Sequence, residues 1–136
     1  LKSSTFLPLS SSAAWCNRGI IHHVRKEYDA AMIAYDRAIE LDPHVHPAWH
    51  NRGRLRVLRE EYREAAEDFG RAIRDELDPL ESLLLRGFAR FESGDPRGAV
   101  EDFERALAIA PPDWVSRAVA ESYLEEARTR AAASPK

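Results

Sequence analysis

One cysteine and two histidines are the side chains in this sequence that come nearest to a catalytic pair. A histidine can activate a thiol as a nucleophile, and His23 follows the single cysteine, Cys16, by two helical turns, while His50 falls on the corresponding face of a later segment. No asparagine or aspartate is placed to orient such a base, and no oxyanion hole is indicated. A lone cysteine also serves as a small apolar core residue. We therefore interpret the chain as non-enzymatic.

The stretch HVHPAWH raises a second kind of chemistry, metal binding. Within it His46 and His50 stand four residues apart, so they would share one helical face and could bind zinc or nickel together, with His44 just before them. A polar turn leading into a helix explains the same residues, and we favour that interpretation. Because the sequence lacks a Walker A loop, a dinucleotide-binding glycine pattern and a paired CxxC motif, we expect neither a metal nor a small-molecule cofactor.

Composition narrows the class of protein. A 15.4 kDa chain with 44% hydrophobic and 32% charged residues suits one globular domain with a core. A net charge of -3 gives no overall attraction to nucleic acid or to an anionic membrane, and no apolar run approaches the roughly 20 residues of a membrane span. The single cysteine cannot form an internal disulfide, so the fold does not require an oxidising compartment. The sequence does not determine the localisation, and a cytoplasmic one is favoured. The start LKSSTFLPLSSS, without Met, is typical of a fragment or a processed form, and we interpret residues 1–11 as a tail or linker.

One interval organises the rest of the chain. Gly19, Gly53 and Gly87 are each 34 residues apart, within the related stretches AWCNRG, AWHNRG and LLLRG. The same step relates small and aromatic residues further along: Ala31, Ala65 and Ala99; Tyr35, Phe69 and Phe103; Ala38, Ala72 and Ala106. Each copy ends in a turn that contains proline.

These landmarks resemble the tetratricopeptide repeat family, a resemblance that runs from about residue 12 to the C-terminus. It implies an all-α fold, a right-handed α-solenoid of three helix-turn-helix repeats at residues 12–45, 46–79 and 80–112. A seventh, capping helix is expected at 113–131, with a disordered tail at 132–136. We also expect a longer turn before the third repeat, because Pro79 lies two residues later than its counterparts Pro43 and Pro111.

Several packing predictions follow from the repeat. The three glycines should let paired helices approach closely opposite the three alanines, with Trp15 and Trp49 in the core. Arg52 should pair with Asp68, and Arg86 with Asp102, within the second and third repeats. In the first repeat the equivalent of these aspartates is Ala34, so Arg18 has only Asp36 nearby as a possible partner. In ESGDPRG, Gly94 should end one helix, Asp95 cap the next and Pro96 begin it.

The last helix should close the array with an apolar stripe on one side and polar residues on the other. The predicted stripe is Trp114, Val115, Ala118, Val119 and Tyr123.

The resemblance implies that function lies on the concave surface, where such proteins bind peptides or partner proteins. We expect a scaffold or adaptor with an apolar groove that takes an amphipathic helix or an extended peptide, anchored by Phe88. The expected groove residues are Cys16, Asn17, Ile20, His23, Val24, His50, Asn51, Arg54, Val57, Leu58, Leu84, Leu85, Phe88 and Phe91.

The family's carboxylate clamp for acidic chaperone tails is not expected here. Its cationic and amide positions fall on Cys16, Ile20, Asn51, Glu81 and Leu85, and only Asn51 matches. A terminal carboxylate would be desolvated there without a cation.

Two alternatives stay open. The chain could be a regulatory or oligomerisation domain of a larger protein. A less favoured alternative is an RNA-associated helical repeat that uses Arg52, Arg56, Arg59 and Arg63.

Overall fold

The computed structural model describes residues 11–134, and this range contains seven α-helices and no strand. They are α1 Ser12–Val24, α2 Tyr28–Leu41, α3 His46–Leu58, α4 Tyr62–Asp75, α5 Leu80–Glu92, α6 Pro96–Ile109 and α7 Arg117–Ala133. The all-α prediction is confirmed. The interpretation of residues 1–11 as a tail lies outside the described residues except at Ser11, whose hydroxyl accepts the Ala14 N–H at 3.0 Å and caps α1.

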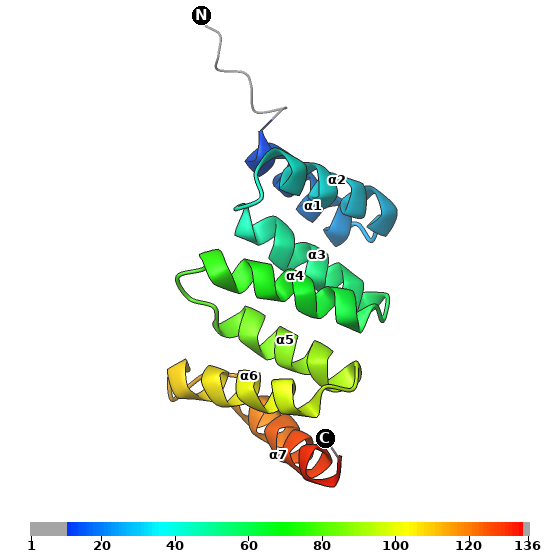
Figure 1. Cartoon of the computed structure of the whole chain (residues 1–136). Coiled ribbons are helices and arrows are strands. Elements are labelled where there is room, and N and C mark those ends of the chain that lie inside the picture. The colour runs from blue at the N-terminus through cyan, green and yellow to red at the C-terminus, as the bar shows by residue number, and fades with distance from the viewer. Residues whose placement is uncertain (1–10, 135–136) are drawn as a thin grey trace, which may run out of the picture.

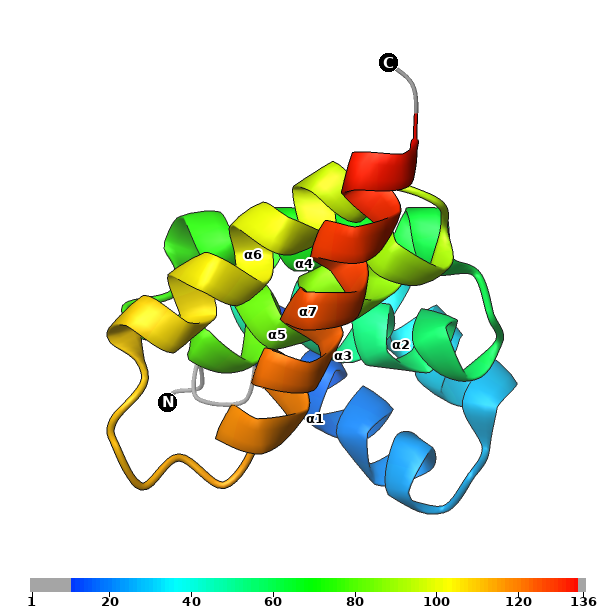
Figure 2. The ribbon, with the colours of Figure 1, turned by 90° about the horizontal axis from the view of Figure 1, so that it is seen from below.

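The helices form antiparallel pairs that stack in one column, an α-solenoid (Figure 1). α1 contacts α3, α3 contacts α5 and α5 contacts α7, whereas α2, α4 and α6 make no such contacts with one another. The chain therefore has an inner side, where α1, α3 and α5 lie close together, and an outer side, where α2, α4 and α6 diverge. Seen along the column, α7 crosses the end of the stack beside α6 and α5 (Figure 2).

Each repeat glycine makes room for an aromatic ring of the paired helix. A β-carbon would lie 2.5 Å from the Tyr35 ring at Gly19, 2.8 Å from the Phe69 ring at Gly53, and 2.7 Å from the equivalent ring in the third repeat. The sequence prediction that bare backbones approach opposite the alanines is thus corrected. Those alanines are fully buried, but the close contact is between the glycine and an aromatic ring of the paired helix.

The turns within the repeats share one backbone conformation. Lys26, Glu60 and Gly94, again 34 residues apart, all have positive φ values of 62°, 60° and 92°. In the third repeat Asp95 accepts the Gly98 N–H at 3.0 Å, and Pro96 is the first residue of α6, so the predicted boundary is confirmed. The expected longer turn before the third repeat is wrong, because residues 42–45 and 76–79 connect the repeats with equal length.

The two tryptophans are only half-buried. Trp15 packs against the first core cluster as predicted, while its outer face carries the guanidinium of Arg18 at 4.5 Å from the ring centroid. Trp49 donates its indole N–H to the Pro43 carbonyl at 2.8 Å. Leu83, the third member of this series, is fully buried.

The capping helix differs from its prediction in bounds and in face. α7 begins at Arg117 rather than 113 and ends at Ala133 rather than 131, so the expected disordered tail at 132–136 begins inside the helix. Val115 and Val119 of the predicted stripe are 93% and 51% exposed. The buried residues are instead Ala120, Leu124 and Ala127, because small side chains at this spacing let α7 lie close to α6.

Candidate binding surface

The arginine ladder inside the repeats is confirmed. Arg52 donates two hydrogen bonds to the Asp68 carboxylate, at 3.0 and 2.9 Å, and Arg86 does the same to Asp102 at 3.0 and 2.8 Å. Asp68 and Asp102 are almost fully buried. Burial raises the pKa of Asp68, and the hydrogen bonds from Arg52 oppose that rise. These arginines are thus structural, since they satisfy carboxylates within the fold.

The partner suggested for Arg18 is corrected by the structure. Asp36 accepts a 2.8 Å hydrogen bond from Arg52 of the next repeat, not from Arg18. The cations considered for RNA are also engaged by carboxylates: Arg56 donates to Asp68 at 3.2 Å, and Arg59 pairs with Asp29. Of that set, only Arg63 is exposed without an ion pair among the described residues.

Two expected groove residues lie in the core instead. Cys16 is 3% exposed and belongs to the first core cluster. Phe91 is 8% exposed, because Tyr123 of α7 packs edge-on against its ring at 5.7 Å. Neither side chain lines a groove.

The catalytic pairing of Cys16 has no support in the side-chain geometry. Burial raises the pKa of the Cys16 thiol, which disfavours the reactive thiolate. His23 Nδ1 is hydrogen-bonded to the Tyr35 hydroxyl at 3.2 Å, and His50 Nδ1 to the Ser82 hydroxyl at 2.7 Å. Each imidazole is therefore held by a hydroxyl group.

The histidines of HVHPAWH also go to separate partners. His50 bonds to Ser82 of α5, and His44 Nδ1 lies 3.3 Å from the Asp75 carboxylate. Within residues 11–134, no three side chains of the types that ligate metals are gathered in one place. The same range contains no helix with both the length and the apolar character of a bilayer span.

Electrostatics on the inner side centre on Arg54. Burial, with the charges of Arg54 and His46, lowers the pKa of His50 from 6.5 to about 4. Burial and Arg54 also lower the pKa of His23. Both imidazoles are therefore neutral at pH 7, and exposed Arg54 supplies the positive charge beside them.

Phe88 lies toward the C-terminal end of α5, among aromatic side chains of two other helices. Its half-buried ring meets Tyr62 edge-on at 5.9 Å and Tyr123 at 5.6 Å. The tyrosines were absent from the predicted groove, although Tyr62 repeats Tyr28 at the start of the paired helix. Phe88 is thus fixed by rings from α4 and α7.

The remaining predicted groove residues differ in exposure. Val24 and Leu58 are 77% and 58% exposed, and Asn17 is exposed. Half-buried residues pack against the cores: Ile20 on the first cluster, Val57 and Leu85 on the second-repeat cluster around Phe69, and Leu84 on the cluster around Phe103. Asn51 is half-buried and donates its side-chain N–H to the Pro47 carbonyl at 2.8 Å.

Comparisons with known proteins agree with this architecture. The stacked helix pairs define the class, an α-solenoid of helix-turn-helix repeats. Two family models described as tetratricopeptide repeat match residues 12–45 and 50–113. The chain belongs to the tetratricopeptide repeat family, which is generally a non-catalytic protein-interaction fold. No curated protein sequence gives a significant match.

Three solved structures illustrate the likeness. The first TPR domain of Spaghetti (RPAP3), bound to the HSP90 peptide SRMEEVD, is 22% identical with a TM-score of 0.77, covering 91% of this chain and 94% of that one. The second TPR domain of human RPAP3, in complex with the HSP70 peptide SGPTIEEVD, is 25% identical with a TM-score of 0.76, covering 89% and 98%. YrrB, a TPR protein described as having an unusual peptide-binding site, is 22% identical with a TM-score of 0.75, covering 91% and 67%.

Proposed function

We propose that this protein is a non-catalytic scaffold or adaptor whose inner side binds a peptide or a partner helix. The proposal rests on the half-buried ring of Phe88, which is held edge-on between Tyr62 and Tyr123. A rigid aromatic side chain of this kind contributes affinity without losing much conformational entropy when a ligand packs on it.

The charges on the inner side favour a particular ligand chemistry. His23 and His50 are neutral at pH 7, so Arg54 can pair with one acidic side chain or with a peptide carbonyl. The exposed Val24 and Leu58 offer apolar contact at the ends of α1 and α3. The ligand that fits is therefore an apolar segment that carries one acidic group.

Peptide binding by related structures supports the same proposal. Both RPAP3 domains are bound to peptides that end in EEVD, and YrrB has an unusual peptide-binding site. This chain differs at the positions that would hold such a tail: Cys16 is buried, Ile20 is apolar and Glu81 is acidic. We propose an internal peptide segment rather than an acidic C-terminal tail, because a terminal carboxylate would meet Glu81 without a compensating cation.

A capture experiment tests the proposal. The tagged wild-type chain and Phe88→Ala are incubated with native lysate, and captured proteins are compared by mass spectrometry. Loss of a partner from Phe88→Ala, with retention by Ile33→Ala, would support the inner side, since Ile33 is an exposed apolar residue of α2 at 66%. A fall of about 2 kcal/mol or more in partner affinity is expected.

A different result for Phe88→Ala would contradict the proposal. If Phe88→Ala mainly lowers the melting temperature and captures the same partners, Phe88 only supports α7 and the proposed binding surface is wrong.

One observation favours the alternative, a domain that packs against a further domain or a second copy. Ile21 is 51% exposed, whereas Leu55 and Ala89, at the same position of the next two repeats, are fully buried by the repeat before them. The first repeat therefore exposes an apolar face, whereas the equivalent face of each later repeat is covered by the repeat before it. Light scattering of wild type and Ile21→Glu tests packing against a second copy: a wild-type dimer that Ile21→Glu dissociates would support it, and a monomer at high concentration would oppose it.

A further inference from the structure

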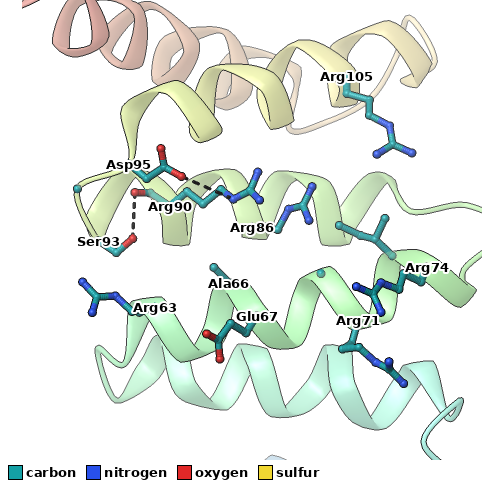
Figure 3. A pocket seen from close by; sticks show the side chains of 13 residues that line it. Arg63, Ala66, Glu67, Arg71, Arg74, Arg86, Arg90, Ser93, Asp95 and Arg105 are labelled. Atoms are coloured by element: carbon teal, nitrogen blue, oxygen red, sulfur yellow. Dashed lines mark hydrogen bonds and ion pairs between the residues drawn. The ribbon is translucent and has the colours of Figure 1, made fainter. Parts of the chain in front are cut away.

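An arginine-rich cleft lies on the outer side of the solenoid, away from the inner side formed by α1, α3 and α5. It has a volume of about 750 Å³. One wall comes from α4, the other from the turn between α5 and α6 and from Arg105 of α6, and Arg86 and Arg90 of α5 lie between them (Figure 3). Two carboxylates, Glu67 and Asp95, line it together with six arginines: Arg63, Arg71, Arg74, Arg86, Arg90 and Arg105. Positive charge is thus concentrated here in a chain whose net charge is -3.

Several of these arginines have no acidic partner. Arg63, Arg74 and Arg105 are exposed, and within the described residues none of them forms an ion pair. Arg71 donates to the Pro43 carbonyl at 2.9 Å and stacks on Trp49. Its Nε is buried without a hydrogen-bond partner.

Comparison with the preceding repeat shows which group is missing. Arg52 is held by Asp68 through Nε and Nη2, and its Nη1 donates to Asp36 at 2.8 Å. Arg86 is held in the same way by Asp102, but the residue 34 positions after Asp36 is Gly70. A β-carbon at Gly70 would lie 3.3 Å from Arg86 Nη1, so this donor faces the space that a carboxylate fills one repeat earlier.

The outer helices of the first two repeats, α2 and α4, differ in the same sense. At three positions α2 carries a carboxylate, and the residue 34 positions later on α4 is an arginine or a glycine. The pairs are Asp29 and Arg63, Asp36 and Gly70, and Glu40 and Arg74. At these three positions α2 supplies carboxylates and α4 does not, although Glu67 and Asp95 also line the cleft.

We propose that this outer cleft binds a segment of a partner protein that is rich in aspartate and glutamate. One carboxylate of the segment takes the position of Asp36 and accepts a hydrogen bond from Arg86 Nη1, while Arg63, Arg74 and Arg105 pair with its neighbours. A carboxylate is favoured over nucleic acid because a carboxylate fills the equivalent position in the fold. Among the described residues, none of those that line the cleft is aromatic, so they offer no ring to stack on a base.

Binding of a fluorescein-labelled oligo-glutamate peptide, measured by fluorescence anisotropy, tests the proposal. Gly70→Asp installs the missing carboxylate inside the chain, so affinity should fall by about tenfold or more. Gly70→Asn has nearly the same size without the charge and should bind within about threefold of wild type. Arg37→Gln on α2 changes the net charge by the same unit outside the cleft and should also leave binding nearly intact.

Folding is checked in parallel. The β-carbon at residue 70 meets only the end of the flexible Arg86 side chain, so thermal melting of both variants should match or exceed wild type. Phe88→Ala should keep its affinity for oligo-glutamate, which separates this cleft from the inner surface.

Three outcomes would overturn the proposal. The first is no peptide binding by wild type at low salt, and the second is equal loss of binding in Gly70→Asp and Gly70→Asn. The third is tighter binding of a labelled oligouridine than of oligo-glutamate, with Gly70→Asp abolishing it, which would assign the cleft to nucleic acid.

Discussion

The ring of Phe69 packs against Gly53, so closely that a β-carbon at residue 53 would come within 2.8 Å of it. This contact joins α3 to α4, and the same relationship recurs in the first and third repeats. A fully buried ring that touches backbone has no room to move, so each repeat depends on a residue without a side chain at this position.

Gly53→Ala should therefore destabilise the protein by about 1–3 kcal/mol, because the added methyl group overpacks the α3–α4 contact. Gly70→Ala is the matched control: it is also in a helix, but its β-carbon meets only the tip of Arg86, so we expect a gain of about 0.5–1 kcal/mol. Urea unfolding followed by circular dichroism measures both. Equal effects of the two changes would contradict the assigned contact.

Removal of Arg52 should cost about 3–5 kcal/mol, because it leaves the Asp68 carboxylate buried with Arg56 as its remaining partner. In a double-mutant cycle, Arg52→Ala and Asp68→Ala should show a coupling of about 0.5–3 kcal/mol. Chemical unfolding of the four proteins gives the coupling. Strictly additive effects would show that the pair is not a stabilising unit.

Stability should fall at acidic pH through His50. Its pKa is lowered to about 4 in the folded chain, so between pH 6.5 and pH 4 the unfolded state binds a proton that the folded state does not. Relative to its value above pH 6.5, the free energy of unfolding should therefore decrease as the pH falls, by about 3 kcal/mol at pH 4.

The comparison that isolates this effect uses His50→Asn, which removes the titration and keeps a group able to bond with Ser82. The free energy of unfolding of wild type should decrease from pH 7 to pH 4 by more than that of the variant. Parallel curves for the two proteins would exclude His50 as the source.

The turn at Glu60 should be improved by glycine. Glu60 has a φ of 60°, a conformation that costs a residue with a β-carbon about 1 kcal/mol, and Gly94 holds the same place in the third repeat. Glu60→Gly should raise stability by about 1 kcal/mol or less, and Gly94→Ala should lower it by a similar amount. Thermal melts in which both changes act in the same direction would contradict the shared turn geometry.

Most of the fold follows from the sequence alone. The 34-residue spacing predicts the paired helices, because helix periodicity, proline turns and the Asp95 cap are local signals. The pairing of Arg52 with Asp68 was also predictable, since both residues belong to one helix pair and their offset recurs one repeat later.

Contacts between repeats, and contacts with α7, could not be predicted from the sequence. Asp36 bonds to the arginine of the next repeat rather than its own, Tyr123 covers Phe91, and α7 buries Ala120 and Leu124 instead of the predicted valines. The position of Arg86 Nη1 beside Gly70 of the preceding repeat is another contact between repeats that the sequence did not predict. Helix periodicity fixes which residues share a face, but the rotation and stacking of one repeat on the next determine which partner that face meets.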